Sequence, residues 1–212
     1  MSLFAKIFEP QLKKCFEQFA ETIGGDFTEG GLWDEYKLIV PYRNTYFIFD
    51  TVRKLRGKRM VRYYRIQCLF VSINYFKFRI SSENTFTHAA KVFGMNDILI
   101  NDKRFDDEFY LESNDKEIFL HFINSDSLRE KYWELLKKKD YHFSFEVRRN
   151  KTSIFKQNTK NVFSIFTESV YSIGGHHQEY IDEWTFYFET FKLTLDRLIE
   201  IGEAEDESPD IQ

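Results

Sequence analysis

The stretch that decides the fold is Tyr36–Phe49, which reads YKLIVPYRNTYFIF. Large apolar residues recur at every second position from Tyr36 to Val40, a period that places them on one face of a strand. Pro41–Asn44 is typical of a turn, and Tyr46–Phe49 continues with a second strand-like run. A connection this short joins antiparallel strands, because a parallel crossover needs a dozen or more residues. The stretch therefore predicts the first hairpin of an antiparallel sheet.

Further strands are predicted on the C-terminal side of this hairpin. Val61–Ile73 is long enough for a full-length strand, and Phe76–Ile80 alternates apolar with basic residues. A second pair is predicted later, where Tyr141–Arg148 alternates apolar and polar residues and Val162–Thr167 is the expected partner. Such one-sided alternation is typical of an antiparallel sheet with one face on the core and one in water.

Helical periodicity is found on both sides of the strands and between them. The apolar residues between Leu12 and Ile23 recur at helical spacing, which predicts an N-terminal helix. Two capping boxes, at Asn114 and at Ser127, predict a central helical insert. The last helix carries a seam with steps of three and four: Ile181, Trp184, Phe188, Phe191, Leu195 and Leu198. This seam predicts lengthwise packing within the chain, with dimerisation as the alternative.

These patterns predict an α+β fold: an antiparallel sheet with an N-terminal helix, a central helical insert and a long C-terminal helix packed on the sheet. The 212 residues fit one domain, which we expect over residues 1–202. Aromatic residues make up 18% of the chain, against only 9 Gly and 3 Pro, so regular structure should dominate. The acidic, apolar-poor residues 203–212 predict a disordered tail.

Charge and cysteine content indicate the setting. Thirty Lys and Arg against 34 Asp and Glu give a net charge of −4, which does not favour a nucleic-acid-binding protein. Cys15 and Cys68 are far apart and lack metal-binding spacing, so we expect two reduced thiols in a cytoplasmic protein. The strongest apolar run, Ile66–Ile73, is too short to cross a bilayer, and we expect a soluble protein without a membrane span.

Sequence motifs for phosphate cradles, nucleophile elbows and zinc proteases are absent, and we expect no cofactor. One candidate metal site is His176, His177 and Glu179 at the start of the last helix. Imidazole and carboxylate groups suit zinc or iron, but adjacent histidines point to different sides of a helix. We therefore predict that acids stabilise the positive helix N-terminus there and that no metal is bound.

A second candidate is the acidic stretch that contains Asp102 and Asp106. Its spacing does not match a calcium loop, which needs alternating acids and a glycine at the sixth position. Phe105 and Phe109 are one helical turn apart, so both can enter the core while the acids face water. We interpret this stretch as structural, with a catalytic or metal-binding role as the alternative.

The third candidate is the basic run Arg53–Arg65, which contains seven cations and no acid. Arg59 and Arg62 are interleaved with Tyr63, and cations next to stackable rings are typical of sites for single-stranded nucleic acid or an anionic surface. The alternative interpretation is a solvated hairpin connection whose charges protect the strand ends.

One segment resembles a known family. Ile98–Asp115 contains the pattern Asp-x-x-Phe-Asp-x-x-Phe followed by Asn-Asp, and is similar to an uncharacterised prokaryotic domain family. The likeness extends in order of elements over residues 33–200. It implies a similar fold but no activity, since the family has none established. Its larger members often carry membrane segments ahead of the domain, and we expect none in this chain.

We expect a non-catalytic cytoplasmic domain that binds a protein or small-molecule partner and is a monomer, or a dimer through the C-terminal helix. Two alternatives remain: an enzyme with a carboxylate or histidine site, and an anion or nucleic-acid binder that uses residues 53–65.

Overall fold

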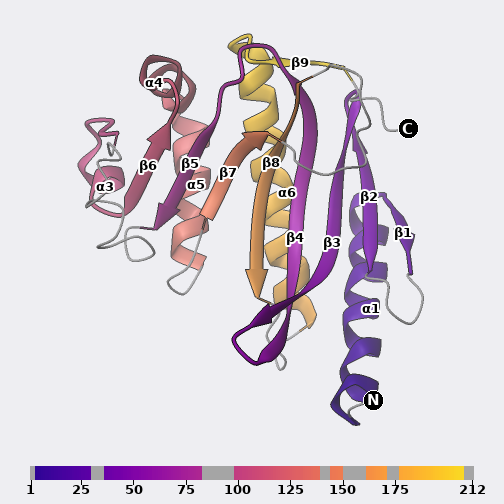
Figure 1. Cartoon of the computed structure of the whole chain (residues 1–212). Helices are drawn as coiled ribbons and strands as arrows, with labels where there is room; N and C mark the ends of the chain where they lie inside the picture. Colours follow the sequence, from indigo (N-terminus) through magenta and orange to yellow (C-terminus); the bar gives the residue numbers. More distant parts are fainter. Residues whose placement is uncertain are drawn as a thin grey trace. The chain divides into compact units, whose positions relative to one another are not determined.

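The computed structural model describes residues 3–29, 36–82, 98–138, 144–149, 161–170 and 177–207 (Figure 1). Within these ranges it contains five helices and nine strands in one antiparallel sheet, which confirms the predicted α+β fold. The helices are α1 (Leu3–Ile23), α3 (Lys103–Asp106), α4 (Lys116–Ile123), α5 (Asp126–Lys138) and α6 (His177–Glu200). The strands are β1 (Asp26–Thr28), β2 (Lys37–Tyr42), β3 (Thr45–Arg56), β4 (Arg59–Ser72), β5 (Phe78–Ser82), β6 (Phe109–Ser113), β7 (Ser144–Arg149), β8 (Val162–Val170) and β9 (Ala204–Glu205).

The chain divides into two compact units. Unit 1 comprises Met1–Cys68 and Glu168–Glu189, and unit 2 comprises Leu69–Thr167 and Thr190–Gln212. Strands β4 and β8 and helix α6 contribute residues to both units. The single domain expected over residues 1–202 stays a prediction.

In unit 1 the predicted hairpin is formed by β2 and β3, which turn at Arg43 and Asn44. Arg43 adopts a positive φ of 50°, which fits a tight turn. Strands follow the order β1-β2-β3-β4, and the register pairs Leu38 with Phe49 and Val40 with Phe47. All four of these side chains are buried. The sequence pattern therefore predicted the pairing of the two strands and the face of β2 that enters the core.

The core of unit 1 is built from aromatic rings on α1, β3 and the first half of α6. Phe19 lies 4.8 Å from Phe49 and 5.5 Å from Trp184, measured between ring centroids. Phe47 makes an edge contact with Phe188 at 4.8 Å. Edge-to-face rings at these separations add to the stability gained from burial alone.

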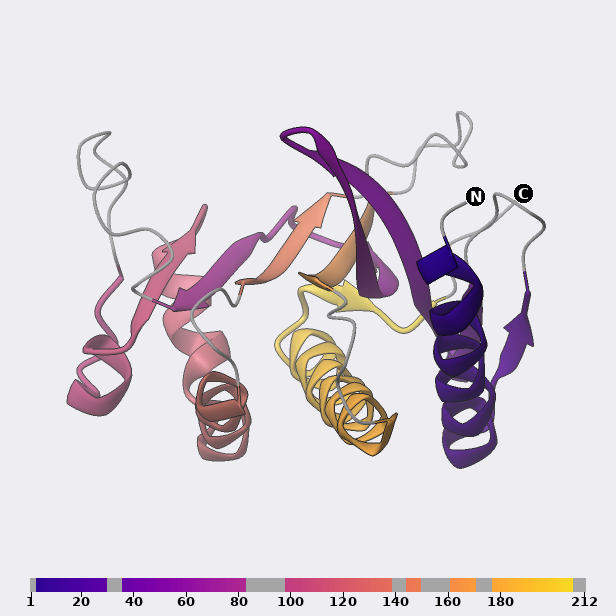
Figure 2. The same cartoon turned by 90° about the horizontal axis from the view of Figure 1, so that it is seen from below.

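In unit 2 the strand order is β8-β7-β5-β6, and α4 and α5 lie on the same side of β5 and β7 (Figure 2). Phe78 of β5 contacts Phe122 of α4 with ring centroids 4.6 Å apart. Phe145 of β7 contacts Phe191 in the second half of α6 at 5.0 Å. The helical insert and the C-terminal helix thus cover one face of these strands, as the sequence predicted.

The seam of α6 is buried within the chain, since all six of its residues are at most 7% exposed. In unit 2, Tyr132 of α5 shares a hydrogen bond of 2.8 Å with Thr194 of α6. Burial raises the pKa of Tyr132, so the phenol stays protonated and available for this bond. The seam is therefore used for intramolecular packing.

Three local features differ from the sequence analysis. The helix α5 begins at Asp126, so Ser127 lies inside its first turn and is not the N-cap that the capping box predicted. The helix α4 is capped by Asp115, which accepts from the Ile118 backbone N–H at 3.0 Å, and not by Asn114. Asn114 instead accepts from the Lys77 N–H at 2.7 Å, because it directly follows β6 beside the start of β5. Residues 203–207 differ from the expected disordered tail: Ala204 pairs with Ser72 of β4 and is 3% exposed.

Phe105 of α3 and Phe109 of β6 support the turn between them. Their rings stack with centroids 4.0 Å apart, and both are at most 1% exposed. We expect Phe105→Ala to lower the free energy of unfolding by about 3–5 kcal/mol, since it leaves a cavity beside Phe109. The exposed Glu108→Gln should change it by less than about 0.5 kcal/mol. Urea unfolding measures both; equal stability of the two variants would contradict a core role for Phe105.

Candidate functional site

The metal site considered at the start of the last helix gains no support from the described residues. His176 lies outside them, as does the side chain of His177, and Glu179 is exposed on the first turn of α6. Across the described ranges, no group of three or more His, Cys, Asp or Glu side chains is placed to hold a metal ion. No helix in these ranges is both long enough and apolar enough to cross a membrane.

Asp102 and Asp106 both have local structural partners. Asp102 is the N-cap of α3 and accepts from the Arg104 backbone N–H at 3.1 Å. Asp106 accepts from the Ile100 N–H at 2.9 Å. Because both carboxylates bind backbone groups of their own turn, their geometry fits the structural interpretation.

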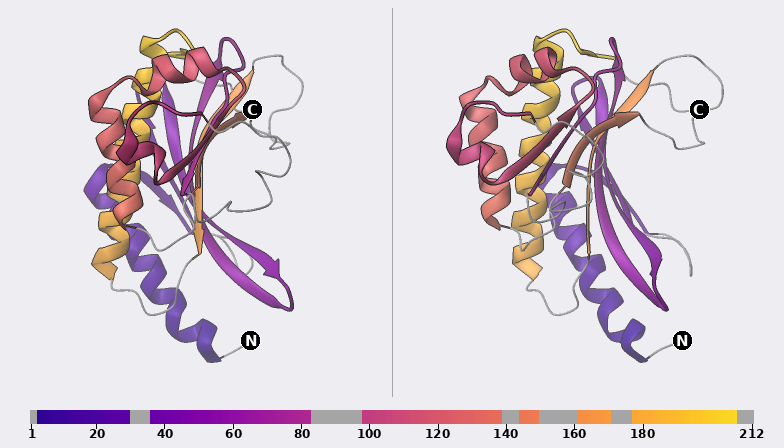
Figure 3. Two further views of the ribbon diagram at one scale, coloured as in Figure 1. Left: turned by 90° about the vertical axis from the view of Figure 1, so that its left-hand side faces the viewer. Right: turned by 60° about the vertical axis from the view of Figure 1, so that its left-hand side comes forward.

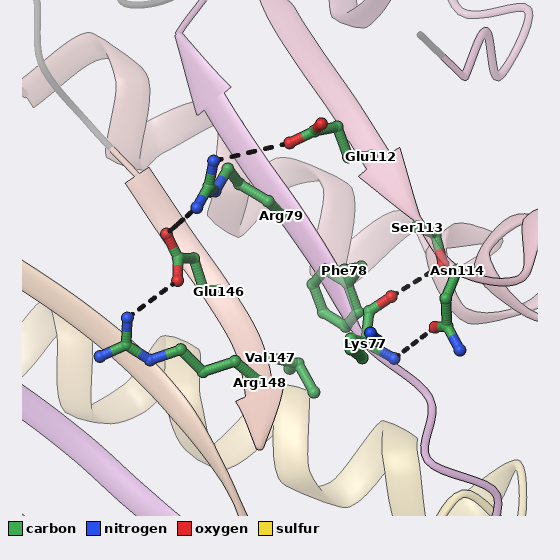
Figure 4. Close-up of a pocket in the computed structure, with 9 residues that line it drawn as sticks. All are labelled: Lys77, Phe78, Arg79, Glu112, Ser113, Asn114, Glu146, Val147 and Arg148. Atoms are coloured by element: carbon green, nitrogen blue, oxygen red, sulfur yellow. Dashed lines mark hydrogen bonds and ion pairs between the residues drawn. The ribbon is translucent and has the colours of Figure 1, made fainter. Parts of the chain in front are cut away.

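The sequence analysis missed a polar hollow of about 370 Å³ on unit 2 (Figure 4). It opens on the sheet face opposite the aromatic contacts of α4, because Lys77 and Arg79 alternate with the inward-facing Phe78. Its lining residues are Lys77, Phe78, Arg79, Glu112, Ser113, Asn114, Glu146, Val147 and Arg148.

The strand register aligns charges of opposite sign across this hollow. Arg79 of β5 stands opposite Glu112 of β6 on one side and Glu146 of β7 on the other. Its guanidinium lies 2.7 Å from a Glu146 oxygen and 3.6 Å from a Glu112 oxygen (Figure 4). Arg148 donates to the second Glu146 oxygen at 3.1 Å and its guanidinium stacks over Phe166 at 3.5 Å. Glu146 therefore joins two arginines.

These pairings limit the chemistry of the hollow. Each of the two carboxylates is held by an arginine, so neither is positioned as an unpaired acid or base for catalysis. Backbone and side-chain groups at the other end are also paired, since Ser113 donates to the Lys77 carbonyl at 3.0 Å. The arrangement resembles a cross-strand ion-pair ladder that stabilises the sheet.

The second candidate surface is the hairpin formed by β3 and β4 in unit 1. The basic run, for which a hairpin connection was the alternative interpretation, lies at the end of this hairpin: β3 extends to Arg56 and β4 starts at Arg59, joined by Gly57 and Lys58. Gly57 has a φ of +63°, a conformation that a two-residue hairpin turn requires. Residues 53–56 are all exposed, and Figure 3 shows the hairpin end curving away from the first half of α6, which belongs to the same unit.

The cations at the base of the hairpin have acidic partners. Arg65 forms a two-pronged ion pair with Asp50, which stands opposite it in the register. Lys54 lies 2.6 Å from a carboxylate oxygen of Glu168 and sits 5.4 Å from the centroid of the Tyr63 ring. The Tyr63 ring thus already makes a cation–π contact with a lysine of the same hairpin.

The cations nearest the turn are in a different environment. Among the described residues, neither Arg56 nor Lys58 has an ion-pair partner. The register also places Arg53 opposite Arg62 and Arg56 opposite Arg59, so the two strands bring arginines to paired positions. Arg56 and Lys58 are thus two cations near the turn that an anion could pair with.

We compared the chain with protein-family models, curated proteins and solved structures, and nothing matched in any of the three. The resemblance to an uncharacterised prokaryotic domain family therefore stays a prediction.

The ladder on unit 2 predicts a measurable cost when its central arginine is removed. Arg79→Gln should lower the free energy of unfolding by about 1–2 kcal/mol, because Glu146 and Glu112 both lose a charged donor. Lys77→Gln, an exposed substitution on the same strand, should stay within about 0.5 kcal/mol. Urea unfolding at low and high salt measures this; a loss that is the same for both variants would contradict the ladder.

Proposed function

We propose that this protein is a non-catalytic cytoplasmic binding domain whose recognition surface is the β3–β4 hairpin and whose partner is anionic. The observation that carries the proposal is the contrast within the hairpin. Acids neutralise cations at its base, while Arg56 and Lys58 at its turn have no ion-pair partner among the described residues.

The physical reason is local electrostatics. A net charge of −4 disfavours an anion at long range, but charges more than about 8–10 Å away are largely screened at physiological ionic strength. A hairpin that extends past the packed part of unit 1 presents its own cations first. Arg56 and Lys58 gain ion-pair partners when an anionic surface binds.

Other features support a binding role in preference to an enzyme. The acids at Asp102 and Asp106 bind backbone groups, and those of the hollow on unit 2 bind arginines. Burial raises the pKa of the Cys15 thiol to about 11, which suppresses the reactive thiolate. Two buried free cysteines support a reducing, cytoplasmic setting. Burial of the α6 seam supports a monomer.

Binding to heparin, a soluble polyanion, tests this proposal. Wild-type protein should be retained on a heparin column despite its net negative charge and should elute with salt. Arg56→Glu combined with Lys58→Glu should elute at much lower salt, because these are the unpaired cations of the turn. A matched control, Lys103→Glu with Lys116→Glu, changes the net charge equally at exposed positions of unit 2 and should elute like the wild type.

Two results would overturn the proposal. One is wild-type protein in the flow-through. The other is a control variant that loses retention as fully as the hairpin variant does, which would make total charge the cause.

A further inference from the structure

The turn of the β3–β4 hairpin carries an apolar pair among its cations. Leu55 and Met60 stand directly opposite each other in the register. They are 69% and 63% exposed, which makes them the two most exposed large apolar side chains among the described residues. Single exposed apolar residues are common, but a facing pair at the end of a hairpin offers a continuous apolar contact.

The alternation of strand residues determines which side chains accompany this pair. Positions two apart share a face, so Arg53 and Arg62 flank Leu55 and Met60 on the same face. Lys54 and Tyr63, which contact each other, lie on the opposite face together with Arg56. One face of the hairpin end thus combines apolar side chains with guanidinium groups, and the turn adds Lys58.

This combination distinguishes between anionic partners. A nucleic-acid strand would use stacking rings beside the cations, but the ring of Tyr63 is already in contact with Lys54 of the same hairpin. A nucleic-acid backbone would also leave Leu55 and Met60 in water. The surface of an anionic bilayer offers phosphates for the cations and, a few ångströms deeper, an apolar layer for the apolar pair.

We propose that the anionic partner is a phospholipid bilayer surface, an inference that rests on the proposed function. Leu55 and Met60 at the end of the hairpin enter the boundary between headgroups and acyl chains, while Arg56 on the other face and Lys58 at the turn contact the lipid phosphates. The hairpin is then a peripheral anchor that binds reversibly from the water side.

A fluorescent probe at the hairpin end tests the insertion. The two native thiols are at most 2% exposed, so in Met60→Cys the new thiol is the accessible site for an environment-sensitive nitrobenzoxadiazole label. Its emission should shift to the blue with vesicles of phosphatidylcholine and phosphatidylglycerol, and should stay unchanged with phosphatidylcholine alone. The label at Glu108→Cys, an exposed position in unit 2, should not shift.

Vesicle sedimentation of the full chain measures affinity. Leu55→Ser with Met60→Ser should weaken binding to the anionic vesicles roughly tenfold or more, since the apolar burial of two side chains is lost. Ile73→Ser with Leu99→Ser, which removes two other exposed apolar residues, should bind like the wild type. Arg56→Glu with Lys58→Glu should abolish binding.

The outcomes separate the two proposals. Two results would overturn the bilayer proposal and leave anion binding intact. One is retention of the wild type on heparin without binding to vesicles. The other is equal vesicle binding by the wild type and by Leu55→Ser with Met60→Ser. Tight binding to a single-stranded oligonucleotide with no vesicle binding would assign the hairpin to nucleic acid instead. Loss of both heparin and vesicle binding in the wild type would overturn both proposals.

Discussion

The aromatic packing of α6 on β3 and β4 is the constraint on which the proposed function depends. Towards the turn of the hairpin, Tyr64 is the last residue with a described ring contact to α6. Its ring centroid lies 5.8 Å from that of Trp184 and 6.4 Å from that of Tyr180. The Tyr64 hydroxyl also donates to Glu183 at 2.7 Å. Tyr64 pairs with the buried Thr51, and the strands continue beyond this pair to the turn. The core thus holds the base of the hairpin and leaves its end in solvent.

Arginines on the two surfaces show how neighbours determine the role of one residue type. Arg79 stands between two carboxylates, so its charge is used within the sheet of unit 2. Arg56 lies near the turn, close to Lys58 along the hairpin, and neither has an ion-pair partner among the described residues. The first arrangement stabilises a fold, and the second raises the local potential that attracts anions. The hairpin end thus keeps the positive charge of Arg56 and Lys58 available for a partner.

Much of the fold follows from the sequence, because burial has a clear period. The alternation around Val40 and the seam through Trp184 predicted which faces are buried. Capping was predicted less well: Asn114 and Asp115 are adjacent and both are good caps, and only the position of Lys77 determines which one binds the helix. The ladder at Arg79 escaped prediction because it depends on pairing between strands that are distant in sequence. The alternation of basic and apolar residues from Phe76 to Ile80 was its only signal.

The candidate site was predicted in composition but not in shape. Seven cations without an acid marked residues 53–65, yet Leu55 and Met60 went unnoticed because their exposure depends on where the core ends.

Backbone amide chemical shifts during a titration with a heparin oligosaccharide test the central claim most directly. The account predicts that the changes concentrate at residues 53–62 and vanish in Arg56→Glu with Lys58→Glu. Changes centred on the strands around Arg79 instead would contradict it.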